Sequence, residues 1–128
     1  MVLFLMRKKV EFVLEHFNLD CKVKVRYKKM KEHYGETHVK AQHYVIYLRP
    51  DIPKFLQTTT LFHELAHVKQ YELDGLYMSD ELMMFKGERH RGNGSASDYW
   101  WYPWEIEARG YEEALLHEWR THKQKKKN

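Results

Sequence analysis

Apolar residues recur along the chain at two periods, and these periods divide it into predicted helices and strands. Over residues 3–17 the apolar positions fall three or four residues apart, which predicts an N-terminal helix. Over residues 21–27 apolar and mostly basic residues alternate, which predicts a strand that is buried on one face. Residues 37–41 and 42–49 are also predicted to be extended, as two strands or as one long bent strand.

A long helical pattern follows these strands. Asp51, ahead of Pro53, is expected to mark the start of this helix, and Gly75 its end. In the middle of this helix Phe62, Leu65, Ala66 and Val68 are apolar and surround a few polar residues. This pattern is typical of a helix that is buried on most sides and presents one functional face.

The periodicity weakens in the next segment and then returns. Ser79 is expected to cap a short helix over residues 79–85. Glycine and serine are frequent in residues 91–97, which predicts a loop over residues 87–98, either a lid over a cleft or an ordinary surface loop. Pro103 is well placed to begin a C-terminal helix. The apolar stripe of this helix comprises Trp104, Ala108, Tyr111, Leu115 and Trp119.

The order of these elements predicts the α+β class. The predicted fold consists of an N-terminal helix, a small, mostly antiparallel sheet of about three strands, a central helix and a C-terminal helix. A chain of 128 residues that is 43% hydrophobic can bury one core, so residues 1–128 are expected to form a single domain. The basic tail over residues 121–128 is expected to fray.

Charge and cysteine content narrow the possible partners. Much of the formal net charge of +4 comes from two basic segments, residues 22–31 and 123–127. Such segments permit binding to nucleic acid or to an acidic partner, although they also occur as solvated strand faces and chain ends. Cys21 is the single cysteine, which excludes an internal disulfide and a thiolate metal site. The apolar residues 1–6 precede their basic neighbours, unlike a secretory signal, and no segment reaches membrane-spanning length, so a cytoplasmic protein without a membrane partner is expected.

The most specific chemical signal is the sequence His63-Glu64-Leu65-Ala66-His67 in the central helix. Residues four apart lie one turn above each other on one face of a helix, so both imidazoles can reach the same metal ion. Zn²⁺ is the expected ion, and Glu64 lies beside its open side, where a carboxylate can accept a proton from water. The pattern predicts His63 and His67 as metal ligands and Glu64 as the general base.

A catalytic zinc ion needs a third protein ligand and keeps its fourth position for water or substrate. The candidates downstream of the motif are His90, Glu105, Glu107, Glu112 and His117. Glu105 lies at the edge of the apolar stripe, one turn from Ala108, whose small side chain lets two helices approach closely. We therefore expect Glu105 to be the third ligand, with Glu107, on the opposite flank of Ala108, as the alternative.

Together the two motifs resemble the gluzincin pattern, in which a zinc helix is followed by a glutamate helix with a small residue three positions after the ligand. In size and order of elements the chain is similar to the minimal gluzincins, small single-domain peptidases of archaea and phages. The resemblance implies a zincin-like fold with zinc held by His63, His67 and Glu105. In that family an aspartate or asparagine often follows the small residue and supports a zinc histidine, whereas this chain has Arg109 there.

Two related zinc patterns match the chain less well. The metzincins have a third histidine six residues after the second, and this position is Leu73. SprT-like proteases carry a downstream histidine in place of the glutamate, a role that His90 or His117 could fill.

These observations predict a zinc-dependent metallopeptidase that hydrolyses peptide bonds in a peptide or protein substrate. Glu64 would take a proton from water and pass it to the leaving amine. A strand such as residues 45–48 could bind an extended peptide by edge pairing. Candidate donors to the oxyanion are Tyr99, Tyr102 and Tyr111.

Two alternatives belong to other functional classes. The first is a zinc-containing module, SprT-like or regulatory, that binds nucleic acid or protein with little or no peptidase activity. The second is a regulatory protein whose own tail occludes the cleft, through His117 or the segment that ends at Asn128.

Overall fold

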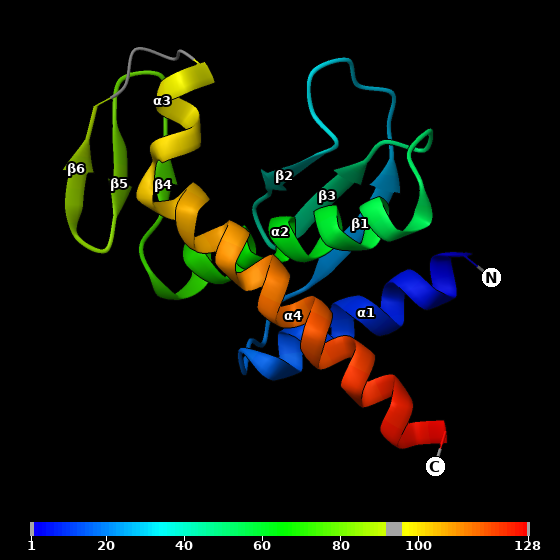
Figure 1. Cartoon of the computed structure of the whole chain (residues 1–128). Coiled ribbons are helices and arrows are strands. Elements are labelled where there is room, and N and C mark those ends of the chain that lie inside the picture. The colour runs from blue at the N-terminus through cyan, green and yellow to red at the C-terminus, as the bar shows by residue number, and fades with distance from the viewer. Residues whose placement is uncertain (1, 92–95, 128) are drawn as a thin grey trace.

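The computed structural model describes residues 2–91 and 96–127 of the chain, and side chains within residues 5–91 and 99–123. Within these residues the chain forms four helices and two three-stranded sheets (Figure 1). The helices are α1 (Val2–His16), α2 (Lys54–Leu73), α3 (Ala96–Trp101) and α4 (Pro103–Lys127). The strands are β1 (Val23–Tyr27), β2 (Gly35–Val39), β3 (Tyr44–Leu48), β4 (Tyr77–Met78), β5 (Met83–Phe85) and β6 (Glu88–His90). The predicted α+β class with small, mostly antiparallel sheets is confirmed, because β1–β3 is the one parallel pair among the described strands.

The first sheet has the strand order β1-β3-β2. β2 and β3 form an antiparallel hairpin with Gly35 opposite Leu48, so the extended region is two strands and not one bent strand. β1 lies parallel to β3 on its other side. Because β3 is paired along both edges, the prediction that residues 45–48 offer a free edge to a peptide is wrong, and β1 and β2 are the edge strands.

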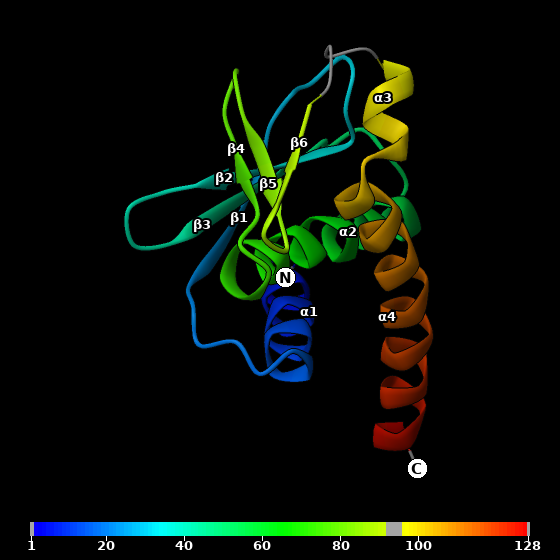
Figure 2. The same cartoon turned by 90° about the vertical axis from the view of Figure 1, so that its left-hand side faces the viewer.

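Helix α2 lies between the first sheet and α4, so most of its circumference is buried (Figure 2). Leu61, Leu65 and Val68 of α2 join Ile46 and Leu48 of β3 in the main core. Each such side chain stabilises the fold by about 1.5–3 kcal/mol when it is fully buried. Helix α2 is therefore held from two sides, and its buried polar residues are held with it.

The two ends of α2 differ in how well the sequence predicts them. Asp51 does not cap the helix, because its carboxylate accepts two hydrogen bonds from Arg49, both of 3.0 Å, and no side chain caps the helix start. Gly75 ends the helix, as predicted, with a φ of +64° that favours glycine. The N–H of Leu76 then donates to the carbonyl of Gln70 at 3.1 Å.

A second sheet, of strand order β4-β5-β6, occupies the segment for which the sequence predicts a short helix, so that prediction for residues 79–85 is wrong. Ser79 caps a turn instead: its hydroxyl accepts a hydrogen bond from the N–H of Leu82 at 3.1 Å. Lys86 and Gly87, with φ values of 51° and 80°, form a two-residue turn of the kind that joins tight hairpins.

The predicted loop over residues 87–98 contains β6 and the first part of α3. Residues 92–95, the middle of the segment predicted to be a lid or an ordinary surface loop, lie outside the described part of the chain.

Helix α4 begins at Pro103, as predicted, and continues through Lys127, so the basic tail over residues 121–128 is helical as far as the structure describes it. Its most deeply buried side chains are Trp104, Ala108 and Leu115, which confirms the centre of the predicted apolar stripe. Neither α4 nor any other helix in the described residues is both long and apolar enough to cross a membrane.

Strand β2 passes very close to α2 at Gly35. A Cβ atom at this position would lie 2.6 Å from Cγ2 of Thr60 and 3.3 Å from Cγ of Glu64. Glycine is therefore the residue that fits without a shift of the backbone, and it sets the distance between β2 and the face of α2 that carries Glu64.

Replacing Gly35 with alanine should destabilise the protein by about 1–3 kcal/mol, because the added methyl group overpacks the contact with Thr60. Thermal unfolding monitored by circular dichroism measures this effect. The double variant Gly35→Ala/Thr60→Ser, which removes the clashing Cγ2, should recover part of the lost stability.

Gly110→Ala is the matched control, because an added Cβ on this α4 residue meets nothing within 4 Å. It should stabilise the helix by about 0.5–1 kcal/mol. A Gly35→Ala variant as stable as the wild type would contradict the close approach of β2 to α2.

Candidate metal centre

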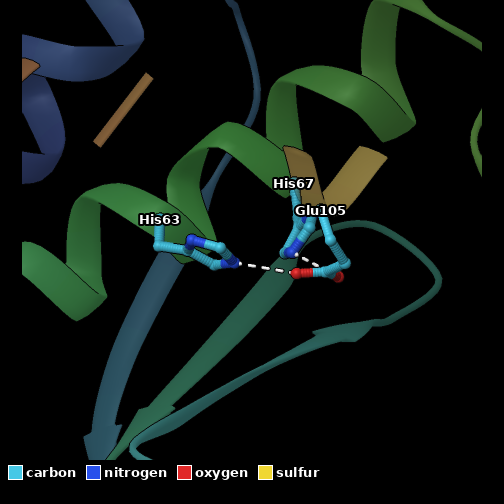
Figure 3. Close-up of side chains that lie close together, drawn as sticks. All are labelled: His63, His67 and Glu105. Carbon is cyan, nitrogen blue, oxygen red and sulfur yellow. Dashed lines mark hydrogen bonds and ion pairs between the residues drawn. The ribbon is translucent and has the colours of Figure 1, made fainter. Parts of the chain in front are cut away.

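Helices α2 and α4 bring His63, His67 and Glu105 together in one cluster (Figure 3). Each residue offers one ligand atom, and these atoms lie within 4.8 Å of one another. Nε2 of His63 is 3.0 Å from one carboxylate oxygen of Glu105, and Nε2 of His67 is 3.1 Å from the other. The cluster could therefore hold a metal ion, and it contains the glutamate that the helical period of α4 favours.

Glu105 reaches the histidines because α4 packs along α2. Ala108, one turn further along α4, is fully buried, in keeping with the small residue expected at a close helix contact. Glu105 itself is only 4% exposed. A carboxylate buried to this extent is stable only when it is hydrogen-bonded and paired with positive charge.

Gln70 fixes the tautomer of His67. The side-chain NH₂ of Gln70 donates to the backbone carbonyl of Trp104 at 2.9 Å and to the carboxylate of Glu107 at 3.1 Å. The amide oxygen of Gln70 therefore faces Nδ1 of His67, 2.7 Å away, where it can only accept a hydrogen bond. Nδ1 of His67 thus carries a proton, so Nε2, which faces Glu105, is the nitrogen that has the lone pair when the ring is neutral.

Glu112 fixes the tautomer of His63 in the same way. A carboxylate oxygen of Glu112 lies 2.8 Å from Nδ1 of His63 and accepts a hydrogen bond from this nitrogen, so Nε2 faces Glu105. Arg109 does not take this supporting role, since its guanidinium donates to the carbonyl of Trp100 at 2.6 Å. Glu112, a candidate ligand from the sequence, instead holds a candidate ligand in place from one turn beyond Arg109.

Positive charge is needed among the three clustered side chains. Without it, two lone pairs would face a carboxylate in a buried space, which is electrostatically unfavourable. Burial lowers the pKa of His63, but hydrogen bonds with Glu105 and Glu112 outweigh burial and raise this pKa to about 10. Burial raises the pKa of Glu105, but hydrogen bonds with His63 and His67 outweigh burial and lower it to about 2. Bound protons satisfy the cluster, and a divalent cation would supply positive charge to the same atoms.

The spacing of the donor atoms can be compared with that around a tetrahedral metal ion such as zinc. With ligand distances of about 2.0–2.2 Å and tetrahedral angles, neighbouring donor atoms around Zn²⁺ lie about 3.3 Å apart. The histidine nitrogens lie 3.0 and 3.1 Å from two different oxygens of Glu105, close to this value, and the three ligand atoms lie within 4.8 Å of one another, so side-chain rotations would bring them around one ion. Zinc-bound histidines also commonly donate their other ring N–H to an acceptor, as both histidines do here.

Three of the remaining candidate ligands, Glu107, His90 and His117, are not part of the cluster. Glu107 accepts a hydrogen bond from Lys86 at 2.7 Å and so links α4 to the second sheet. His90 packs edge-on against an indole ring, with 5.3 Å between ring centres, and His117 is exposed on α4. Of the two glutamates expected from the sequence, Glu105 is the one beside the histidines, and neither His90 nor His117 joins them.

Glu64 lies next to the cluster at the side of a cleft. It is 7% exposed, and one of its carboxylate oxygens accepts a hydrogen bond from the hydroxyl of Thr37 at 2.7 Å. Thr37 is on the edge strand β2 and does not stand out in the sequence, because no local spacing connects it with Glu64. The contact fixes the orientation of the carboxylate.

The cleft has a volume of about 210 Å³ and is bounded by β2, α2, α4 and the segments near β4 and α3. Glu64, His67 and Glu105 line its metal side. Its other lining residues include Gly35, Thr37, Tyr71, Leu76, Met78, Tyr99 and Trp104. The predicted base and two of the three clustered side chains therefore face one common space.

The structure separates the three candidate tyrosines. Tyr99 lines the cleft, whereas Tyr102 stacks on Trp104 with 4.6 Å between ring centres. Tyr111 packs edge-on against Phe17. Tyr99 is therefore the candidate that can reach a substrate in the cleft.

The hydroxyl of Tyr99 stays protonated and can donate a hydrogen bond. Burial of the hydroxyl end, followed by the negative charges of Glu105 and Glu64, raises its pKa although 42% of the side chain's surface is exposed. Tyr71 lines the cleft as well, and burial and the same carboxylates raise its pKa. Sequence reasoning misses Tyr71, although its place four residues after His67 on α2 puts it on the same helix face.

Comparison with protein-family models, with curated proteins and with solved structures gives no match to this chain. The class that the fold and the site define is thus an α+β protein with a histidine–glutamate cluster that could hold a metal ion. A more specific function rests on the geometry of the cluster and the cleft.

Removing the acceptor of either Nδ1–H should weaken metal binding. Gln70→Ala and Glu112→Ala should each lower the affinity for Zn²⁺ by about 10–100-fold, because the histidine loses the partner that fixes its tautomer and ring orientation. Competition with a chromophoric chelator measures the affinity, and circular dichroism verifies that each variant is folded.

Glu107→Gln is the matched control, because it keeps an acceptor for Gln70 and leaves both histidines supported. It should bind Zn²⁺ nearly as the wild type does, whereas Glu105→Gln should lose tight binding. The opposite order of effects at these two positions would contradict the place of Glu105 in the cluster.

Proposed function

We propose that the protein is a zinc-dependent metallopeptidase of the gluzincin type. His63, His67 and Glu105 would hold the zinc ion, and Glu64 would act as general base and then as general acid. One observation carries the proposal: two histidine Nε2 atoms and a carboxylate converge beside Glu64 at the side of a cleft.

The donor set supports zinc, since two imidazoles and one glutamate are a known ligand set of catalytic zinc sites. The same set also holds iron(II) in some oxygenases. The placement of Glu64 between two histidines four residues apart on one helix favours zinc hydrolysis. A bound zinc ion would lower the pKa of water toward neutrality and polarise the scissile carbonyl.

The residues around the cluster supply the remaining chemistry. Thr37 holds one carboxylate oxygen of Glu64, which leaves the other to take a proton from the attacking water. Glu64 then passes this proton to the leaving amine. The hydroxyl of Tyr99 donates a hydrogen bond to the oxygen on which negative charge develops, with Tyr71 as a second donor on the same cleft.

The substrate would pair with the free edge of β2. The carbonyl of Tyr34 accepts from Arg49 and the N–H of Lys40 donates to His43, both at 2.9 Å, so even-numbered residues of this strand bond to β3. The N–H and C=O groups of Gly35 and Thr37 therefore point away from β3, on the strand that borders the cleft. An extended peptide could bind these groups as an added strand.

The cleft favours an apolar side chain next to the scissile bond. Leu76, Met78 and Trp104 form much of its wall. Its 210 Å³ is below the roughly 300–1,000 Å³ that encloses a drug-sized ligand, so it would hold one part of a longer substrate.

The alternative of a cleft that is closed by the protein's own tail finds no support in the structure. Helix α4 carries the described part of the tail away from the second sheet and α3, as Figures 1 and 2 both show. The alternative of a zinc-containing binding module shares the metal cluster, so it differs from the proposal in the absence of cleavage.

Glu64→Gln should abolish peptide hydrolysis, with at least a thousand-fold loss of kcat/KM (about 4 kcal/mol or more), because an amide cannot accept the proton of water. Cleavage of a fluorogenic peptide library with apolar residues measures activity. Elemental analysis should find zinc in the variant at the wild-type level, since Glu64 is not among the three clustered ligands. Normal hydrolysis by this variant would contradict the mechanism.

Tyr99→Phe should lower kcat by roughly 10²–10³-fold with a much smaller change in KM, because it removes a donor to the developing oxyanion. Steady-state kinetics on the same peptides separates the two constants. Tyr102→Phe, whose ring stacks on Trp104, should leave kcat unchanged. Equal losses in both variants would argue against a role of Tyr99 in catalysis.

A further inference from the structure

The face of the first sheet that points away from α2 carries many basic side chains. Tyr44, Ile46 and Leu48 of β3 face the core with α1 and α2, so Val45 and Tyr47 point to the opposite face. The same alternation places the basic residues of β1 on that face, since Val23 and Val25 pack toward the core. We call this surface the basic face; its residues are Lys22, Lys24, Arg26, Lys28, Glu36, His38, Lys40, His43, Val45 and Tyr47.

One end of the basic face gathers ammonium groups. Strand pairing brings three lysines to the neighbourhood of His43: the N–H of Lys40 donates to the carbonyl of His43, the carbonyl of Lys22 accepts from the N–H of Tyr44, both at 2.9 Å, and Lys24 pairs with Val45. Desolvation and then the charges of Lys24, Lys22 and Lys40 lower the pKa of His43. Among the described residues, no carboxylate forms an ion pair with any of these three lysines. The cluster therefore has uncompensated positive charge that an anionic partner would neutralise.

The other end of the basic face presents an aromatic ring beside a lysine. Tyr47 is half-buried in the central strand, with the ammonium group of Lys28 5.3 Å from its ring centre. The ring of His38 lies edge-on at 4.8 Å. The carboxylate of Glu36 is already paired with His38 at 2.9 Å and with Lys28 at 3.6 Å.

We propose that the basic face binds single-stranded nucleic acid, with phosphates at Lys22, Lys24 and Lys40 and a base against Tyr47. Proteins that bind single strands without sequence preference combine a positively charged track with aromatic rings on which bases stack. Residues 43–47 of β3 span about 13 Å, which is room for a few nucleotides. The surface lies across the sheet from α2, so binding there does not depend on the metal centre.

Single-stranded nucleic acid fits these features better than an acidic protein does. An acidic protein would neutralise the lysines but has no general use for an aromatic ring beside them. A duplex offers phosphates but keeps its bases stacked inside. The lysine cluster near His43 and the ring of Tyr47 lie at different places along β3. A single strand of nucleic acid also carries phosphates and bases at different places along its length, so it can contact both.

Fluorescence anisotropy with labelled oligo(dT) and oligo(rU) of about twelve nucleotides tests the proposal on the full chain. The logarithm of the affinity should fall with the logarithm of salt concentration with a slope of about −2, as expected for three phosphate contacts on a single strand. Lys22→Glu/Lys24→Glu should weaken binding at low salt at least ten-fold. Arg89→Glu/Arg120→Glu, which changes the net charge equally at exposed sites elsewhere, should leave most of the binding intact.

Tyr47→Leu should weaken binding about five-fold or more without changing the salt slope, and Tyr47→Phe should bind as the wild type does. Zinc content and peptide cleavage should be unchanged in all the charge variants, so failure here is distinct from failure of the proposed peptidase.

Three results would overturn the inference. The first is absence of oligonucleotide binding at low salt. The second is equal weakening by the two double variants. The third is that poly-glutamate or a duplex of similar charge binds as tightly as the single strands while Tyr47→Leu has no effect.

Discussion

The site depends on two buried acceptors that turn two histidines toward the same point. Gln70 and Glu112 accept the Nδ1 protons of His67 and His63, and this leaves both Nε2 atoms facing the carboxylate of Glu105. Two nitrogen lone pairs that face a carboxylate in a buried space are electrostatically unfavourable unless positive charge lies among them. Binding of a metal ion would relieve this cost, and its free energy would also stabilise the contact between α2 and α4.

The fold places each part of the site on an element with other contacts. Helix α4 supplies both Glu105 and Glu112, and Gln70 connects His67 to the start of that helix through the carbonyl of Trp104. Strand β2 supplies Thr37, whose hydroxyl donates a hydrogen bond to Glu64 and so orients it. The two faces of the first sheet differ in character: one packs against the helices, and the other carries exposed basic residues.

The sequence predicts the parts of this protein that depend on local spacing. The motif of α2, the start of α4 and the choice of Glu105 follow from helical period, and the structure places these residues as that period indicates. Gln70 and Thr37 are not predictable in this way, because they act through contacts between elements that only tertiary packing brings together. The short helix over residues 79–85 fails for a related reason: a tight turn at Lys86 and Gly87 allows strand pairing, which overrides a weak local helix signal.

X-ray absorption at the zinc edge of the purified protein tests the central claim most directly. The claim predicts one zinc ion per chain with two imidazole nitrogens at about 2.0–2.1 Å and oxygen ligands at about 2.0–2.2 Å. The imidazole contribution should fall to that of a single ring in the His63→Ala variant. Protein that binds no zinc after metal loading, or a zinc shell without two imidazoles, would contradict the account.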